Sequence, residues 1–149
     1  MAFEELTPVS FTDHIIQTAL GRGRKKAALI TNRDNLIKNR KRELARIQTM
    51  QGVAIQHLNV EQFPSIDKLS PFYQHLFNDF IDVDAYKVAH SRVKGSVTVI
   101  KRISTIYQKK IQKAENQPEI KQLANQYIGR FSSVIKKITN SLKKSYSFL

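Results

Sequence analysis

The sequence predicts an all-α protein: an antiparallel helical bundle of three to four long helices plus a short helix. Apolar residues recur at alternating intervals of three and four along most of the chain, which is the spacing of one helix face. The connections between these segments are short, so consecutive helices are expected to lie antiparallel. The five glycines and four prolines do not cluster into a linker. We therefore expect residues 1–149 to form a single helical-bundle domain.

Two long helices are predicted in the first half of the chain. The first begins near Ser10–Thr12, because Ser10 and Asp13 have capping-box spacing. Its apolar face consists of Ile16, Leu20, Gly23, Ala27 and Ile30. The second begins at Thr31, with Asp34 three residues on, and its apolar face consists of Leu36, Leu44, Ile47, Met50, Ala54 and Leu58. The chain then breaks at Phe63-Pro64, since a residue before proline disfavours the α region.

A short helix and two more long ones are predicted in the second half. Ser70-Pro71 is the expected N-cap and first position of a short helix that ends at Ile81. Asp82 and Asp84 start a long helix whose apolar stripe is Ala89, Val93, Val97, Ile100, Ile103, Tyr107 and Ile111. Asn116 and Glu119 cap the last helix around Pro118, and its stripe is Ile120, Leu123, Tyr127, Phe131, Val134, Ile138 and Leu142.

Charge is sorted into blocks along the chain. The net charge is +13 and the pI is near 10.1. Residues 21–46 carry ten bases against two acids, residues 61–84 carry five acids against Lys68, and residues 85–113 carry eight bases and no acid. This pattern is typical of a chain that meets a polyanion with some faces and protein with others.

Several functional classes lack support in the sequence. Without Cys, the chain has no disulfide and no thiolate metal site. The four histidines, His14, His57, His75 and His90, lack the spacing of a metal site, and no catalytic group of side chains is evident. The N-terminus lacks the pattern of a signal peptide, and the aliphatic run Val97–Ile100 is far too short to span a membrane. We expect no metal, no active site and no membrane partner.

The basic block at the junction of the first two helices is the leading candidate for contact with RNA. Its bases outnumber the acids that would pair with them along a helix, so a solvated bundle face explains them less well. The predicted RNA-binding residues are Arg22, Arg24, Lys25, Lys26, Arg33, Lys38, Arg40, Lys41, Arg42 and Arg46.

Three positions in or near this block have a structural interpretation as well. Arg40 or Lys41 falls where the apolar stripe passes between Leu36 and Leu44, which favours a side chain that snorkels or pairs with an acid. Gly23 lies on the apolar stripe, which favours close helix packing over a minor-groove hook. The bases at residues 85–113 form either a second RNA surface or a solvated face.

The segment FPSIDKLSPFYQHLFNDFIDVDAYKVA, beginning at Phe63, resembles the N-terminal domain of the Nog-type nucleolar GTP-binding proteins. The matching residues are Phe63-Pro64, Asp67, Pro71-Phe72-Tyr73, Leu76, Asp84 and Tyr86-Lys87. Two further stretches agree: the basic end of the first helix at Arg24 to Ala28, and the last helix, with Gly129-Arg130, Ser133 and Leu142 in place. The resemblance extends over essentially the whole chain.

The resemblance implies a domain that precedes an Obg-type GTPase domain and contacts large-subunit ribosomal RNA during ribosome assembly. Arg130 joins the predicted RNA-binding residues on this ground. The sequence has no GxxxxGK[ST] phosphate loop, so we expect no GTPase activity here, and GTP and Mg only in the absent GTPase domain. The implied location is the cytoplasm for an archaeal protein, which the short length suggests, or the nucleolus for a eukaryotic one.

A second hypothesis is a protein-interaction module that docks on its own GTPase domain or on an assembly factor. The acidic segment would supply the contact through Asp67, Asp79, Asp82 and Asp84, although helix capping also explains the last two. Ribosomal proteins are further expected partners, and we expect a monomer. The aromatic side chains Phe72, Phe77 and Phe80 are spaced for core packing, whereas Tyr73 is the one expected to be exposed.

Overall fold

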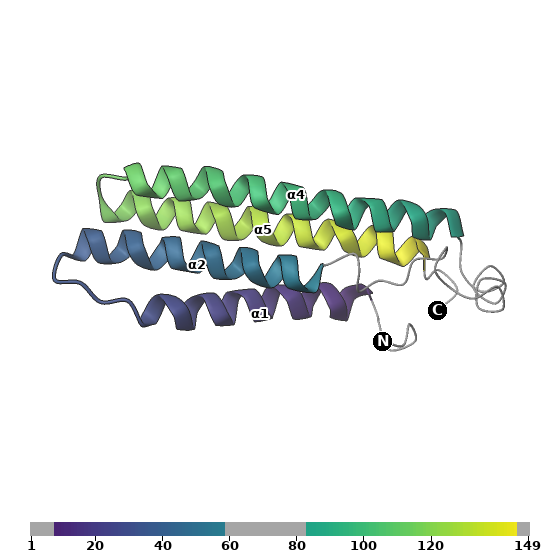
Figure 1. The fold of residues 1–149 in the computed structure, drawn as a ribbon, viewed down its shortest axis with the longest axis horizontal. Helices are drawn as coiled ribbons and strands as arrows, with labels where there is room; N and C mark the ends of the chain where they lie inside the picture. Colours follow the sequence, from purple (N-terminus) through teal and green to yellow (C-terminus); the bar gives the residue numbers. More distant parts are fainter. Residues whose placement is uncertain (1–7, 59–82, 146–149) are drawn as a thin grey trace.

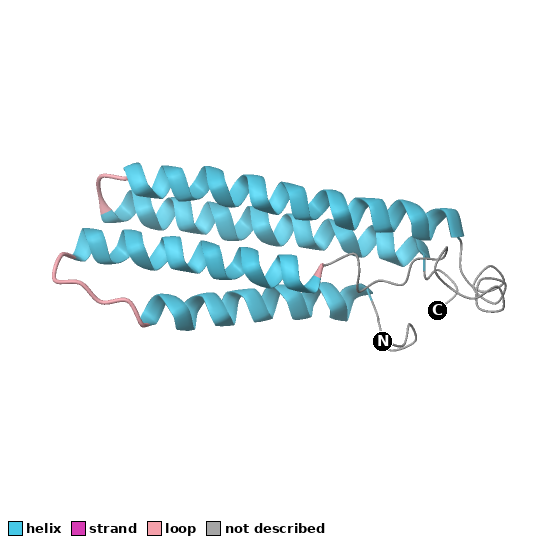
Figure 2. Ribbon diagram, viewed as in Figure 1, coloured by secondary structure: helices cyan, strands magenta, loops and turns pink. Residues whose placement is uncertain are grey.

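A computed structural model describes residues 8–58 and 83–145 of the chain. It contains the helices α1 (Pro8–Ala28), α2 (Asn35–His57), α4 (Val83–Lys113) and α5 (Gln117–Ser145). The described residues form helices and turns with no strand (Figure 2). The predicted all-α bundle with long helices is therefore confirmed. The break at Phe63-Pro64 and the short helix predicted up to Ile81 lie outside the described residues.

The four helices pack as two antiparallel hairpins laid side by side (Figure 1). α1 pairs with α2 and α4 pairs with α5, while α2 also packs on α4 and α1 on α5. The turns at residues 29–34 and 114–116 lie at one end of the bundle. The end of α2 and the start of α4 lie at the opposite end. The pairs α1–α2, α4–α5, α2–α4 and α1–α5 are antiparallel, as expected for helices with short connections, whereas α2 and α5, which also touch, run parallel.

Two helix boundaries in the first hairpin differ from the prediction. α1 begins at Pro8 and ends at Ala28, so Ile30 lies beyond the helix. α2 is capped by Asp34 and not by Thr31: the Asp34 carboxylate accepts a 3.0 Å hydrogen bond from the Ile37 amide. A carboxylate at the N-cap accepts a hydrogen bond from an otherwise unbonded amide, and the positive end of the helix dipole stabilises its charge. The predicted start at Thr31 was therefore wrong by one helical turn.

The predicted cap of α5 is confirmed. The Asn116 side chain accepts a 2.9 Å hydrogen bond from the Glu119 amide, and the Glu119 carboxylate accepts one of 3.1 Å from the Glu115 amide. These reciprocal bonds satisfy amides at the helix start and allow α5 to begin after only three intervening residues beyond the end of α4.

The predicted apolar stripes supply much of the core, which also buries residues that no stripe included, among them Ile15, Ala19, Val53 and Ile135. Tyr127 and Phe131 of α5 are its largest fully buried side chains. The Tyr127 ring lies edge-on to that of Tyr107, with centroids 5.9 Å apart. Besides Tyr107, Tyr127 and Phe131, the residues that the stripes predicted and the structure buries are Ile16, Ala27, Ile47, Met50, Ala54, Leu58, Val93, Ile100, Ile103, Ile111, Ile120 and Ile138. Within the described ranges, no helix is long and apolar enough to cross a membrane.

Candidate nucleic-acid interface

The bases of the first hairpin gather where α1 ends and α2 begins. The helix α1 carries Lys25 and Lys26 in its last turn, where positive charge is favourable next to the carbonyl end of the helix. The basic side chains of this region that are exposed are Arg22, Arg24, Lys25, Lys26, Arg33 and Lys41. Asp34 is exposed among them, and its carboxylate caps α2. This arrangement provides a cationic surface suited to phosphate groups.

Arg40 has an intramolecular role. Its Nε donates a 2.8 Å hydrogen bond to the backbone carbonyl of Ala114, and its Nη2 donates to the same oxygen. Ala114 is fully buried in the turn that joins α4 to α5. Arg40 thus neither snorkels to water nor pairs with an acid, the two outcomes weighed from the sequence. It satisfies a carbonyl at the end of α4 and fastens α2 to the second hairpin.

Arg42 holds the turn of the first hairpin. Its Nε donates a 2.9 Å hydrogen bond to the carbonyl of Ile30, which lies just beyond α1. The bond connects the first turns of α2 to the segment that leads into it. Because Arg42 is half-buried, its guanidinium serves the fold at a position that the charge pattern had assigned to RNA alone.

Arg46 pairs with Glu43 one turn earlier on α2. The Arg46 Nε lies 3.0 Å from the Glu43 Oε2, and both atoms are buried with no further hydrogen-bond partner. Burial raises the pKa of the Glu43 carboxyl, while the charge and hydrogen bond of Arg46 oppose that rise. The Arg46 guanidinium is therefore engaged in an ion pair with Glu43 on the same helix.

Gly23 allows α1 to approach α2 at this pair. A Cβ at Gly23 would lie 3.0 Å from the Arg46 Cγ and 3.3 Å from the Met50 Cγ. Gly23 is buried and helical, so the prediction of close helix packing at this position is confirmed.

Arg130 lies on the second hairpin, apart from the other predicted RNA-binding residues. Its guanidinium carbon is 5.8 Å from the centre of the Tyr107 ring, and the Lys110 ammonium is 5.2 Å from the same centre. Both cations are exposed and attracted by the ring's electrons.

The second hairpin displays many more bases than sequence reasoning assigned to RNA. Its exposed bases among the described side chains are Lys87, Arg92, Lys94, Lys101, Arg102, Lys109, Lys110, Lys113, Lys121, Arg130, Lys136 and Lys137. The exposed acids of this hairpin that the structure describes are Asp84 at its start and Glu115 and Glu119 at its turn. The choice between a second RNA surface and a solvated face stays open.

The acidic candidates for protein docking fall mostly outside the described chain. Asp67, Asp79 and Asp82 lie there, as does Tyr73. Asp84 is exposed in the first turn of α4, where the positive end of the helix dipole stabilises a carboxylate. Lys38, the remaining predicted RNA-binding residue, is half-buried.

A metal site finds no support in the part of the chain that the structure describes. No group of three or more His, Asp or Glu side chains gathers there. His14 and His57 do meet between α1 and α2, with ring centroids 5.4 Å apart, a contact that their separation in sequence conceals. The His57 Nδ1 lies 2.9 Å from the Val53 carbonyl, so that nitrogen is engaged within its own helix.

Comparison with known proteins decides the family. The profile described as the NOG1 N-terminal helical domain matches residues 3–145. The chain belongs to the NOG1 N-terminal helical domain family. The resemblance drawn from the segment beginning at Phe63 is therefore confirmed.

Relatives of this NOG1-type domain include proteins from archaea and eukaryotes. An uncharacterised protein of Methanocaldococcus jannaschii is 24% identical over 140 residues, which cover 91% of this chain and 40% of the relative. Nucleolar GTP-binding protein 1 of Encephalitozoon cuniculi is 26% identical over 144 residues, covering 95% of this chain and 27% of that protein. Nucleolar GTP-binding protein 1 of Arabidopsis thaliana is 31% identical over 83 residues, 56% of this chain and 12% of the relative. The chain thus spans well under half the length of these relatives.

Proposed function

We propose that the chain is a ribosomal-RNA-binding helical domain of a GTPase that acts in assembly of the large ribosomal subunit. The observation that carries the proposal is the family match over residues 3–145, in a chain of net charge +13. Relatives with this domain are named nucleolar GTP-binding proteins, which favours work in the nucleolus or, for an archaeal protein, in the cytoplasm.

The exposed bases at the turn of the first hairpin support the RNA contact. Lys25 and Lys26 on α1 and Lys41 on α2 are exposed on two helices that pack against each other. Phosphates on a nucleic acid attract such charges without reading sequence, and RNA helices present phosphates and 2′-hydroxyls more accessibly than base edges.

Nucleotide chemistry belongs to the rest of the proposed protein. The printed sequence has no GxxxxGK[ST] loop, and the relatives are longer than this chain. GTP and Mg are therefore proposed for a separate GTPase domain, which this bundle would place against RNA.

The test is binding of the domain to large-subunit ribosomal RNA fragments over a range of salt concentrations, with duplex DNA as competitor. The variant is the triple change Arg22→Glu, Lys25→Glu and Lys26→Glu, which reverses exposed charges of α1. The control is Lys94→Glu, Lys109→Glu and Lys121→Glu, which changes net charge equally on the second hairpin.

We expect the α1 variant to lose RNA affinity and to lower the slope of log K against log salt by about 2, because each lost phosphate contact removes about 0.7–0.9. Helicity measured by circular dichroism should stay unchanged. Equal losses in variant and control would mean a general polyanion effect, and full binding by the α1 variant would contradict an RNA contact at this hairpin.

A further inference from the structure

The ring of Tyr107 on α4 supports two exposed cations of the second hairpin. The Lys110 ammonium is 5.2 Å from the centre of this ring, and the Arg130 guanidinium carbon is 5.8 Å from it. Tyr107 itself is only 2% exposed, so the ring is buried while the cations reach solvent. Lys110 stands one turn further along α4, whereas Arg130 comes from α5. The packing of the two helices therefore brings two positive charges to one buried ring.

Neither of these charges is neutralised by an acid. In the described ranges, Lys110 and Arg130 take part in no ion pair, whereas Arg46 of α2 is paired with Glu43. An aromatic ring attracts a cation through its electrons but carries no net charge, so the charge of each cation stays available. The ring also restricts two long side chains before a ligand arrives, which reduces the entropy cost of binding. Bases that are held and unpaired in this way are well suited to bind an anion.

Gln126 adds hydrogen-bond donors next to the two cations. The Tyr107 hydroxyl donates a 3.4 Å hydrogen bond to the Gln126 Oε1, which orients the amide. Gln126 is exposed on α5, one turn before Arg130. Its carbonyl oxygen is engaged, and no described residue accepts a bond from its nitrogen, so both N–H donors stay available. An ammonium, a guanidinium and an amide thus lie around Tyr107, and each offers donors to an anion.

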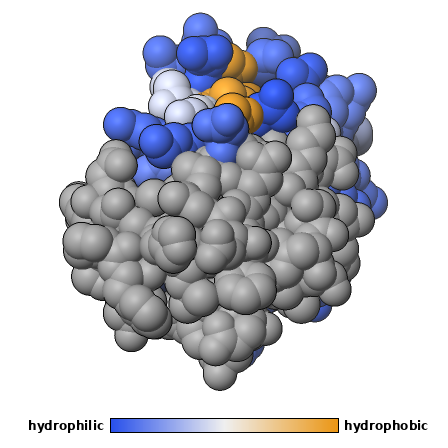
Figure 3. Space-filling view, turned by 90° about the vertical axis from the view of Figure 1, so that its right-hand side faces the viewer, coloured by the Kyte–Doolittle hydropathy of each residue, from blue (hydrophilic) through white to orange (hydrophobic). Residues whose placement is uncertain are grey.

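The charge of the whole hairpin favours an extended polyanion over a single carboxylate. Its exposed bases outnumber its exposed acids, which in the described ranges are Asp84 at the start of α4 and Glu115 and Glu119 at the turn. Figure 3, which views the bundle from the end where α4 begins, shows mainly hydrophilic surface over the described residues. A polyanion is attracted by the whole array of charges, whereas one carboxylate gains from its nearest neighbours alone. The charge distribution therefore favours the phosphates of a nucleic acid.

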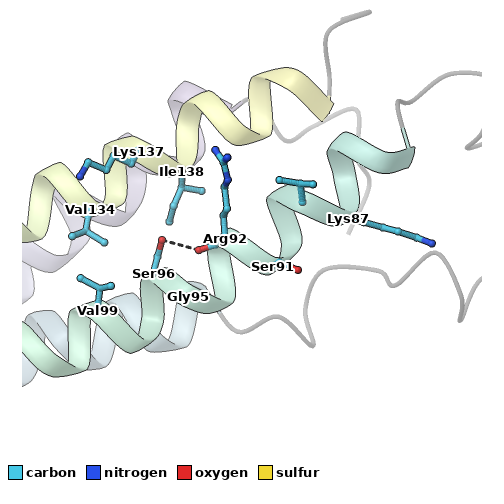
Figure 4. A pocket seen from close by; sticks show the side chains of 10 residues that line it. Lys87, Ser91, Arg92, Gly95, Ser96, Val99, Val134, Lys137 and Ile138 are labelled. Atoms are coloured by element: carbon cyan, nitrogen blue, oxygen red, sulfur yellow. Dashed lines mark hydrogen bonds between the residues drawn. The ribbon is translucent and has the colours of Figure 1, made fainter.

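A groove farther along the same two helices lacks this arrangement. It has a volume of about 880 Å³, and Figure 4 shows Lys87, Arg92 and Lys137 among its lining residues. Arg92 already has an interaction partner. Lys87 points away from α5, and neither Lys87 nor Lys137 lies over an aromatic ring in the part of the chain that the structure describes. These two lysines therefore provide a matched control for Lys110 and Arg130.

We propose that Lys110, Gln126 and Arg130 bind phosphate groups of an RNA backbone, with Tyr107 as the positioning residue that holds the cations. This inference rests on the RNA-binding function proposed above and adds a contact on the second hairpin, apart from the exposed bases of α1. Arg130 offers a planar fork that binds two phosphate oxygens, and Lys110 adds a compact charge. Contacts of this kind hold an RNA strand in place without reading its bases.

The test measures fluorescence anisotropy of the full chain with a labelled fragment of large-subunit ribosomal RNA over a range of salt concentrations. The site variant is Lys110→Gln with Arg130→Gln. The charge control is Lys87→Gln with Lys137→Gln, which removes the same charge from the same hairpin. All four side chains are exposed, so both variants should fold as wild type does.

A second pair of variants tests the ring without changing the net charge. Tyr107→Leu removes the support of the two cations. Phe131→Leu removes another buried ring of the same core, over which no cation lies in the described ranges. Circular dichroism shows whether both variants fold. If Tyr107→Leu does not fold, the site variant and its charge control still decide the question.

The site variant should bind RNA about tenfold more weakly and lower the slope of log K against log salt by about 1.5, because two phosphate contacts are lost. The charge control should leave the slope nearly unchanged. Tyr107→Leu should weaken binding by about threefold although both cations are still present. Phe131→Leu should bind RNA as wild type does.

Four results overturn the proposal while leaving RNA binding by the domain intact. Equal losses in the site variant and the charge control would mean a diffuse effect of charge. Full binding by the site variant, with binding lost in the α1 variant, would confine the RNA contact to the first hairpin. Equal binding by folded Tyr107→Leu and Phe131→Leu would remove the positioning role of the ring. Decaglutamate that binds wild type but not the site variant, with RNA binding unchanged, would make this a protein contact.

Failure of the proposed function gives a different result. Wild type would then bind none of the ribosomal RNA fragments at any salt concentration, and this site would fall together with that function.

Discussion

Arg40 of α2 donates two hydrogen bonds to the backbone carbonyl of Ala114, a residue 74 positions later in the chain. The bonds join the two hairpins at the end of the bundle where both described turns lie. A guanidinium offers several donors in a fixed fork, so it can place two of them on one oxygen where an ammonium cannot.

Replacing Arg40 with methionine should therefore destabilise the fold. The change keeps most of the apolar stem and removes both donors, and we expect the free energy of unfolding to fall by about 1.5–3 kcal/mol. Urea denaturation measures this fall. Lys41→Met, on the exposed side of the same helix, should stay within about 0.5 kcal/mol of wild type. Equal effects of the two changes would contradict the structural role of Arg40.

The buried hydrogen bond between Ser104 and Tyr127 should show strong coupling. The two hydroxyl oxygens lie 2.7 Å apart, and both side chains are fully buried between α4 and α5. Ser104→Ala leaves the tyrosine hydroxyl without this partner, so we expect a loss of about 1–3 kcal/mol. Adding Tyr127→Phe should restore part of that loss, because no polar group then stays unsatisfied. Additive single effects in this double-mutant cycle would mean that the bond contributes little.

Alkaline pH should destabilise the fold through Tyr127. Burial raises the pKa of its hydroxyl from 10.0 to about 12, and the hydrogen bond from Ser104 only partly opposes that rise. The unfolded chain therefore releases this proton at a lower pH than the folded one, so stability falls as pH rises from 10 toward 12 and is unaffected at neutral pH. We expect the free energy of unfolding to fall by an amount on the order of 2 kcal/mol over that window. Chemical denaturation at a series of pH values measures this fall. Tyr127→Phe should lose this part of the pH dependence, and an unchanged profile in that variant would exclude Tyr127 as its source.

Two glycines on α1 should respond oppositely to a larger side chain. Gly23→Leu places atoms against Arg46 and Met50, and overpacking of this kind costs about 1–3 kcal/mol. Gly21→Ala adds a Cβ where no atom lies within 4 Å, so it should stabilise the helix by about 0.5–1 kcal/mol. Thermal unfolding followed by circular dichroism distinguishes them. A stabilising Gly23→Leu would show that α1 and α2 can move apart without loss.

The candidate interface was only partly predictable. The charge pattern located the exposed bases correctly at Lys25, Lys26 and Lys41, because a base on the polar side of an amphipathic helix faces water. The charge pattern could not distinguish these exposed bases from Arg42, which donates a hydrogen bond to the Ile30 carbonyl. No feature of the sequence indicates that this backbone carbonyl needs a side-chain donor. The pairing of Glu43 with Arg46 did have a sequence signal, because residues three apart lie on one helix face.

The sequence by itself determined that the described chain folds into long helices and, approximately, which face of each is buried, although α2 begins later than predicted and Ile15 and Ile135 join the core. The reason is that a period of 3.6 fixes the direction of Tyr107, Tyr127 and Ile138 before any packing takes place. Only the tertiary structure showed that Arg40 donates to the Ala114 carbonyl and that Gly23 lets α1 pack closely against Arg46 and Met50 of α2. It also showed that Gly95 lines a groove between α4 and α5. These contacts depend on the distance and rotation between helices, which side-chain packing sets and periodicity alone does not encode.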